Sequence, residues 1–90
     1  MDMPRLLIAD SCDEFRQILF STLSGEYIIQ TCSSGAKALS LLRSFRPQLM
    51  ILDLALPELD GLSLLQRASQ ENIRPAVLVT GTYTLSLIHI

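Results

Sequence analysis

Three polar residues of this 90-residue chain each follow a run of four apolar residues, and their types suit phosphate and metal chemistry. They are Asp10, Asp53 and Thr80. Carboxylates are ligands that Mg²⁺ accepts together with phosphate oxygens, and a hydroxyl can donate a hydrogen bond to a phosphoryl oxygen. In open parallel α/β sheets, ligands bind outside the carboxyl ends of the strands. If the three apolar runs are strands of such a sheet, one edge of it is the candidate site.

The elements that must position these residues alternate between strand and helix patterns. Apolar residues recur at helical spacing in 13–23, between Gly35 and Pro47, and from Gly61 to Glu71. Asp13 or Ser11 is suited to capping the first helix. Strands are predicted at 6–9, 27–32, 49–53 and 76–79. Several of these strands are continuous apolar runs, which favours an incomplete, doubly wound parallel α/β sheet with the order β-α-β-α-β-α-β.

Composition narrows the class of protein. The hydrophobic fraction of 49% against 18% charged residues excludes a disordered or fibrous chain. A net charge of −2 gives no electrostatic reason to expect contact with nucleic acid or an anionic membrane. No apolar run is long enough to span a bilayer, so we expect a cytoplasmic chain. Cys12 and Cys32 have no metal-ligand spacing, and we expect both to be reduced thiols.

Residues 5–82 resemble the receiver domain of two-component response regulators. The most specific match is the segment 53–61, in which Asp53 is followed by Pro57 and then by Asp60 and Gly61. Asp10 matches the family's acidic position after the first strand, and Thr80 matches its switch hydroxyl after the fourth. The resemblance implies a flavodoxin-like fold.

The resemblance also implies a function, that of a signalling domain and not of an enzyme. Asp53 would accept a phosphoryl group from a histidine kinase or a phosphotransfer protein. Mg²⁺ would be held by Asp10, Asp53 and the carbonyl group of Ala55, and Thr80 would donate to a phosphoryl oxygen.

The chain departs from the family pattern at two places. Receivers usually carry two adjacent acids after the first strand, whereas Asp10 is followed here by Ser11. A serine hydroxyl is a neutral and weaker ligand for a hard cation, although Asp13 is close enough in sequence to be a substitute. The family's lysine at the end of a fifth strand has no counterpart, because the single lysine, Lys37, begins the second predicted helix.

Other interpretations of the same residues remain open. An acid such as Asp10 after a strand often only caps a helix, and Thr80 alone could satisfy a local backbone group. Asp60 and Gly61 are predicted to form a turn and a helix start. The alternative function is a pseudo-receiver, a protein-binding module that is not phosphorylated. A metal-dependent phosphatase would need a second acid near Asp53, where Ala55 stands.

The chain divides into residues 1–84, the N-terminal part of a receiver domain, and residues 85–90. The last six residues carry no turn residue or cap, and they resemble the conceptual translation of a transposon adapter used to prepare sequencing libraries. We therefore expect 85–90 to be a non-native tail, in which His89 has no role as a ligand or base. The last helix, strand and helix of the family's fold are missing from the predicted order.

Overall fold

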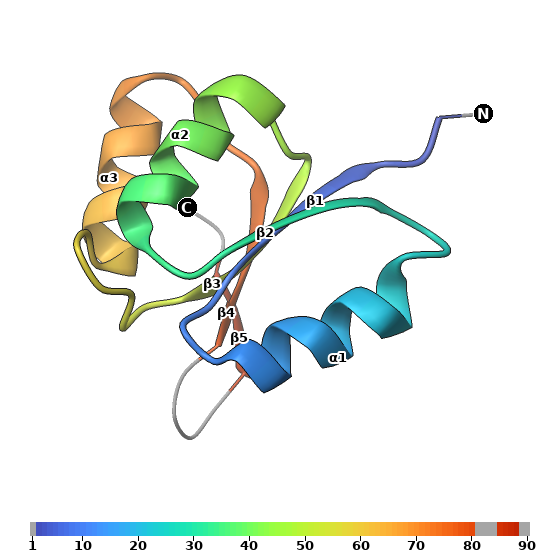
Figure 1. The fold of residues 1–90 in the computed structure, drawn as a ribbon. Helices are drawn as coiled ribbons and strands as arrows, with labels where there is room; N and C mark the ends of the chain where they lie inside the picture. The colour runs from blue at the N-terminus through green and yellow to red at the C-terminus, as the bar shows by residue number, and fades with distance from the viewer. Residues whose placement is uncertain (1, 81–84, 89–90) are drawn as a thin grey trace.

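The structure is a computed structural model that describes residues 2–80 and 85–88, and it has three layers (Figure 1). Along the chain, the elements are β1 (Arg5–Ala9), α1 (Asp13–Leu23), β2 (Ile28–Cys32), α2 (Gly35–Phe45), β3 (Leu49–Asp53), α3 (Gly61–Gln70), β4 (Ala76–Thr80) and β5 (Leu85–Ile88). Helices α2 and α3 lie together on one face of a central sheet, and α1 lies on the other face (Figure 1). Within the described ranges, none of the helices has the length and apolar character needed to cross a membrane.

The strand order is β2-β1-β3-β4-β5, and the first four strands pair in parallel. This order is that of flavodoxin-like folds, so the predicted doubly wound α/β class is confirmed. Strand β5 was not predicted and pairs antiparallel to β4, with Leu85 opposite Thr80. The exposed backbone groups at the edge of β4 can accept any extended segment that lies beside them, whatever its origin.

The expected division of the chain after residue 84 remains a prediction. Strand β5 lies within the segment that we expect to be a non-native tail, and pairing to β4 does not decide its origin. Gly81 and His89 lie outside the described residues.

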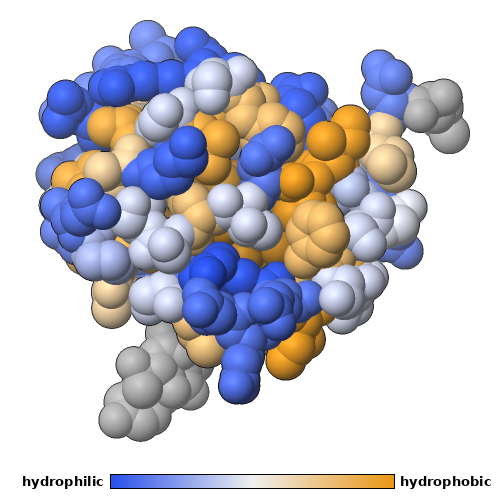
Figure 2. Space-filling model, viewed as in Figure 1, coloured by the Kyte–Doolittle hydropathy of each residue, from blue (hydrophilic) through white to orange (hydrophobic). Residues whose placement is uncertain are grey.

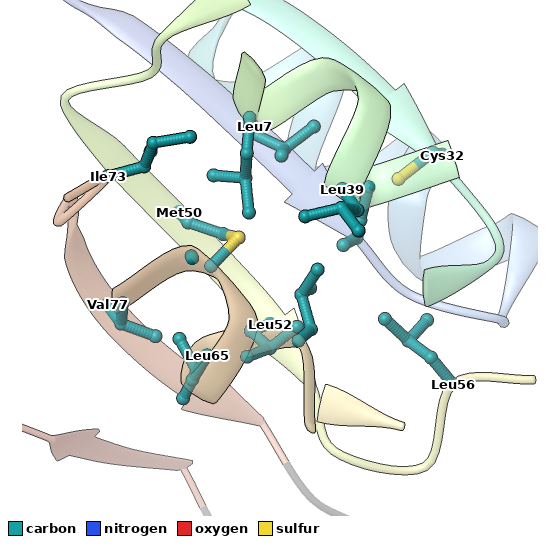
Figure 3. Close-up of a cluster of buried hydrophobic side chains, with 14 of the residues drawn as sticks. Leu7, Cys32, Leu39, Met50, Leu52, Leu56, Leu65, Ile73 and Val77 are labelled. Carbon is teal, nitrogen blue, oxygen red and sulfur yellow. The ribbon is translucent and has the colours of Figure 1, made fainter. Parts of the chain in front are cut away.

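The hydrophobic core is larger on the face that α2 and α3 cover. Strand residues alternate between the two faces, so Leu7, Met50 and Leu52 pack toward α2 and α3 (Figure 3). The opposite cluster contains three buried residues, Leu6, Ile8 and Ile51, and α1 itself contributes no fully buried side chain. The sheet is therefore anchored mainly by α2 and α3.

The outer surface of α1 and the edge strand β2 carry exposed hydrophobic side chains. Ile18 and Phe20 of α1 are 62% and 46% exposed, and Ile28 of β2 is 46% exposed. Figure 2 shows hydrophobic residues at the surface on the side of the molecule where α1 and β2 lie. The continuous apolar pattern predicted coverage on both faces, and the edge strand β2 is the exception.

Local side-chain bonds fix where α2 and α3 begin. Ser34 accepts a hydrogen bond from the amide of Lys37 at the start of α2, and Asp60 accepts one from Ser63 at the start of α3. The expected cap of α1, Asp13 or Ser11, is wrong. The N-cap residue is Cys12, which makes no side-chain cap bond, and the Asp13 carboxylate instead lies in the first turn, where negative charge is favourable.

Gly35 allows the loop between β3 and α3 to touch the start of α2. Its amide donates to the carbonyl oxygen of Pro57 at 3.0 Å, and a Cβ atom added to Gly35 would lie 1.7 Å from the carbonyl oxygen of Leu59. That separation is far below a van der Waals contact, and the obstructing atom is backbone. The loop that follows Asp53 therefore depends on a residue without a side chain in α2.

We expect Gly35→Ala to destabilise the fold and Gly25→Ala to leave it nearly unchanged. A Cβ atom at Gly25 would meet no atom within 4 Å, which makes this position a matched control. Forced overpacking of this kind costs about 1 to 3 kcal/mol. Urea unfolding of both variants measures the difference, and equal stability of the two variants would contradict the close approach at Gly35.

Candidate functional site

The parallel register brings the three predicted polar residues to one edge of the sheet. Asp53 is paired with Thr80 across β3 and β4, and Ala9 is paired with Leu52 across β1 and β3. Asp10 follows Ala9 directly, so it leaves β1 beside Asp53. The expected convergence of these residues is therefore seen in the structure, at the carboxyl ends of three neighbouring strands.

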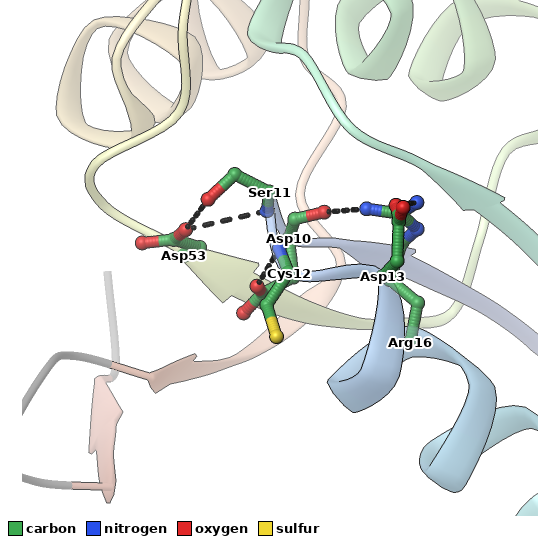
Figure 4. Close-up of polar contacts among 6 residues, drawn as sticks. All are labelled: Asp10, Ser11, Cys12, Asp13, Arg16 and Asp53. Carbon is green, nitrogen blue, oxygen red and sulfur yellow. Dashed lines mark hydrogen bonds and ion pairs between the residues drawn. The ribbon is translucent and has the colours of Figure 1, made fainter.

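Both oxygens of the Asp53 carboxylate accept hydrogen bonds. The amide of Ala55 donates to Oδ1 at 2.9 Å, whereas Ser11 donates to Oδ2 from its hydroxyl at 3.1 Å and from its amide at 3.4 Å (Figure 4). Asp53 is partly buried, so its side chain remains reachable from the pocket. The carboxylate is thus oriented by the turns that follow β1 and β3.

Asp10 and Thr80 are buried and bonded to each other. Each is 6% exposed, and the Thr80 hydroxyl lies 3.3 Å from Oδ2 of Asp10 and 3.4 Å from the carbonyl oxygen of Leu52. The other oxygen of Asp10 accepts the amide of Cys12 at 2.8 Å. Asp10 therefore stabilises the turn that leads into α1 but is not its N-cap, which is Cys12, and it also faces the Thr80 hydroxyl.

An open pocket of about 370 Å³ connects these groups. The residues that line it come from the ends of β1, β3 and β4 and the start of α1: Asp10, Ser11, Cys12, Phe15, Asp53, Ala55 and Thr80. The sequence did not single out Cys12 or Phe15 as lining residues. Their place between the first strand end and the first helix is the only signal that could have found them.

The other residues considered at the sequence level lie elsewhere or act structurally. The Asp13 carboxylate pairs with Arg16 and does not line the pocket, so it does not replace a second acid. Lys37 is in the first turn of α2 and is likewise outside the pocket lining. Cys12 and Cys32 are both free thiols, and burial raises the pKa of Cys32.

Asp60 and Gly61 have the structural roles that the sequence predicted. Asp60 accepts hydrogen bonds from the amide and hydroxyl of Ser63, and the amide bond is the main cause of its lowered pKa. A Cβ atom on Gly61 would lie 2.9 Å from the carbonyl oxygen of Asp53 and 2.7 Å from the Cα atom of Leu54. The start of α3 is thereby packed directly against the end of β3.

The donors in the pocket are of the type that suits a hard divalent cation. Two carboxylates, from Asp10 and Asp53, and the backbone of Ala55 line the same space. Mg²⁺ is commonly bound by one or two carboxylates together with substrate phosphates and water, so this set fits it. Among the described residues, no group of three or more His, Cys, Asp or Glu side chains is placed to hold a metal. Two carboxylates, those of Asp10 and Asp53, therefore supply the negative charge that the lining of this pocket offers to a cation.

The loop between β3 and α3 contains a tight turn with unusual backbone geometry. Glu58 has a φ of 70°, and the amide of Leu59 donates to the carbonyl oxygen of Pro57 at 2.8 Å. A bond between residues two apart around a positive φ is a rare and strained γ-turn. The loop that carries the Asp53 backbone onward is thus held in a conformation that glycine would adopt more easily.

Comparison with known proteins identifies a single family. The model of the "Response regulator receiver domain" family matches residues 6–88. The chain is 38% identical over 80 residues to protein-glutamate methylesterase/protein-glutamine glutaminase 2 of Rhodopseudomonas palustris, covering 87% of this chain and 22% of that protein. It is 35% identical over 79 residues to the transcriptional regulatory protein AfsQ1 of Streptomyces coelicolor, covering 87% of this chain and 35% of that protein. The chain thus spans a minor part of these relatives.

Solved structures show the same fold. The signal receiver domain of a putative LuxO repressor protein from Vibrio parahaemolyticus superposes with a TM-score of 0.84 at 25% identity, covering 92% of this chain and 65% of that one. The chemotaxis protein CheY4 of Vibrio cholerae superposes with a TM-score of 0.83 at 23% identity, covering 92% of this chain and 72% of that one.

We expect Glu58→Gly to raise the free energy of unfolding, because glycine removes the strain of the positive φ. Strain of this kind costs about 1 to 3 kcal/mol, and the extra freedom of glycine in the unfolded chain offsets roughly 0.4 to 1 kcal/mol of that gain. Glu58→Ala removes the same carboxylate but keeps the Cβ atom, so it is the matched control. Thermal and urea unfolding compare the two variants, and a glycine variant no more stable than the alanine variant would disprove the strain.

Proposed function

The chain belongs to the family of response regulator receiver domains, and we propose that it acts as a phosphoacceptor in a two-component phosphorelay. In this proposal, Asp53 accepts a phosphoryl group from a histidine kinase or a phosphotransfer protein, with Mg²⁺ as the cofactor. One of the relatives is a sensor histidine kinase, TmoS of Ectopseudomonas mendocina, which is 35% identical over 71 residues that make up 79% of this chain and 7% of that protein.

The observation that carries the proposal is the arrangement around Asp53. Its carboxylate lies in an open pocket with a second carboxylate, two hydroxyl groups and the backbone of the following turn. Phosphoryl transfer has a loose transition state, so a protein catalyses it mainly by positioning groups and neutralising charge. Asp53 is oriented by Ser11 and Ala55 before any donor arrives, which meets the first of these requirements.

The proposed transfer is a substitution at phosphorus. One Asp53 oxygen forms a bond to phosphorus as the bond between phosphorus and the donor histidine nitrogen breaks, and that nitrogen keeps the electron pair. The product is an acyl phosphate on Asp53. The hydroxyl of Thr80, which lies near Asp10 and the Leu52 carbonyl group, would turn to donate to a phosphoryl oxygen.

A divalent cation would be held by the carboxylates of Asp10 and Asp53 and by the carbonyl group of Ala55. When bound, it would supply positive charge against the phosphoryl oxygens and against the two neighbouring carboxylates. Two unit charges about 4 Å apart interact by roughly 4 kcal/mol at an effective dielectric constant of 20, so the neutralisation is substantial.

The proposed activity is that of a signalling domain and not of an enzyme. The similarity to the methylesterase covers 22% of that protein, and its name describes that complete protein and not the shared part. The similarity to AfsQ1 covers 35% of a transcriptional regulator. Relatives with different names share this domain, as expected for an input module whose output lies in an attached part.

A pseudo-receiver that binds a partner without phosphorylation is the second candidate. Ser11 favours it, because a neutral hydroxyl stands beside Asp53 where receivers usually have a second acid. Among the described residues that line the pocket, only Asp10 and Asp53 are acidic. The two candidates differ in whether Asp53 takes up phosphate in the presence of Mg²⁺.

We expect acetyl phosphate and Mg²⁺ to add one phosphoryl group to the wild-type chain and none to Asp53→Asn. Asp60→Asn is the matched control, because Asp60 belongs to the same loop, lies outside the pocket and is replaced by another good helix cap. Intact-protein mass spectrometry measures the label, which hydroxylamine should remove. Equal labelling of Asp53→Asn and wild type would refute the phosphoacceptor role.

Magnesium titration separates the receiver from the pseudo-receiver. For a receiver, we expect saturable changes in the backbone NMR signals of Ser11 and Ala55 at millimolar Mg²⁺, and their loss in Asp10→Asn, which removes one of the two carboxylates. No change up to that range, combined with no labelling by acetyl phosphate, would favour the pseudo-receiver.

A further inference from the structure

Ser11 makes the only side-chain hydrogen bond to Asp53 found among the described residues. Its hydroxyl donates to Oδ2 at 3.1 Å, next to a longer bond from its own amide at 3.4 Å (Figure 4). The amide bond is available to any residue at this position, but the hydroxyl bond is not. The serine side chain therefore adds a contact to Asp53 that depends on residue type.

The two oxygens of Asp53 face different parts of the chain. Oδ1 is held by the amide of Ala55 in the turn after β3. Oδ2 faces the turn after β1, where Ser11 follows Asp10 (Figure 4). Rotation of the carboxylate would break both sets of bonds. The hydroxyl of Ser11 thus helps to fix the side chain that we propose as the phosphoacceptor.

A cation held by Asp10 and Asp53 would share the pocket that Ser11 also lines, and Ser11 donates to Oδ2 of Asp53. A hydrogen-bond donor and a cation both stabilise the negative charge of a carboxylate oxygen. A carboxylate that already accepts a hydrogen bond therefore gains less from a bound cation. The serine hydroxyl does so without adding charge, whereas an acid at this position would add a third negative charge and attract a cation more strongly.

We infer that Ser11 is a positioning residue, whose neutral hydrogen bond holds Asp53 in place without a metal while leaving the pocket with weakened affinity for a divalent cation. This inference rests on the proposed function for its biological meaning, since it describes the same acceptor carboxylate. Its physical content, the orientation of Asp53 and the charge of the pocket, is measurable without any phosphoryl transfer.

The orientation is tested in the metal-free full chain with Ser11→Ala. The Ala55 amide donates to Oδ1 of Asp53, so its hydrogen exchange reports how firmly the carboxylate is held. Loss of a net hydrogen-bond contribution of about 0.6 kcal/mol corresponds to roughly threefold faster exchange. Ser11→Thr keeps a hydroxyl and should restore the wild-type rate.

Ser44→Ala is the matched control for this measurement. It removes an exposed serine hydroxyl that bonds to the Ser40 carbonyl group within α2, and Ser44 does not line the pocket. Its Ala55 exchange rate should equal that of wild type. An unchanged rate in Ser11→Ala, or the same acceleration in Ser11→Thr, would overturn the positioning role.

The charge argument is tested with Ser11→Asp. Titration of the metal-free variant with Mg²⁺, followed by the NMR signal of Ala55, should give a dissociation constant at least about tenfold lower than that of wild type. An equal or higher dissociation constant would overturn this part of the inference. Because neither measurement involves a phosphodonor, absence of acetyl phosphate labelling would refute the proposed function while leaving the inference standing.

Discussion

The parallel pairing of β1, β3 and β4 is the constraint on which the site depends. Backbone hydrogen bonds fix the register at one residue per position, so that Asp53 is opposite Thr80 and Asp10 leaves its strand beside Asp53. A slip of one residue would turn every side chain of a strand to the other face. The alternation of core residues between the two faces opposes such a slip, because Leu7 and Leu52 would then lose their places under α2 and α3. Packing of the core thus stabilises the strand register that brings Asp10, Asp53 and Thr80 together.

The loop after Asp53 is fixed by close backbone packing at both ends. Gly35, at the start of α2, lies in close contact with the backbone of Leu59. Gly61, at the start of α3, lies in close contact with the end of β3. Between these contacts, Glu58 adopts a positive φ. Side chains at either glycine would force the backbone around Asp53 to move. The larger core cluster lies on the same face as α2 and α3, so the loop is attached to the side of the sheet that has the larger core.

The pocket around Asp53 holds little charge and several hydrogen-bonding groups. Two acids, a serine and a threonine meet there, and the serine supplies a hydrogen bond where a further acid would supply charge. Hydrogen bonds orient a carboxylate at short range, whereas charge draws in a cation over a longer distance. An arrangement with more hydrogen bonds and less charge favours a fixed orientation of the Asp53 carboxylate over a strong metal site.

The sequence by itself determined the α/β class, the order of the elements from β1 to β4 and the three polar residues at strand ends, because apolar runs, helical spacing and turn residues are local properties. It also determined the role of Asp60 as a helix cap, a contact between residues three apart. Only the tertiary structure decided that Ser11 contacts Asp53 and that Cys12 and Phe15 line the pocket. Ser11 and Asp53 are 42 positions apart in the sequence, and their contact depends on the side-chain rotamers and on how the strands are arranged. No local sequence pattern encodes such contacts.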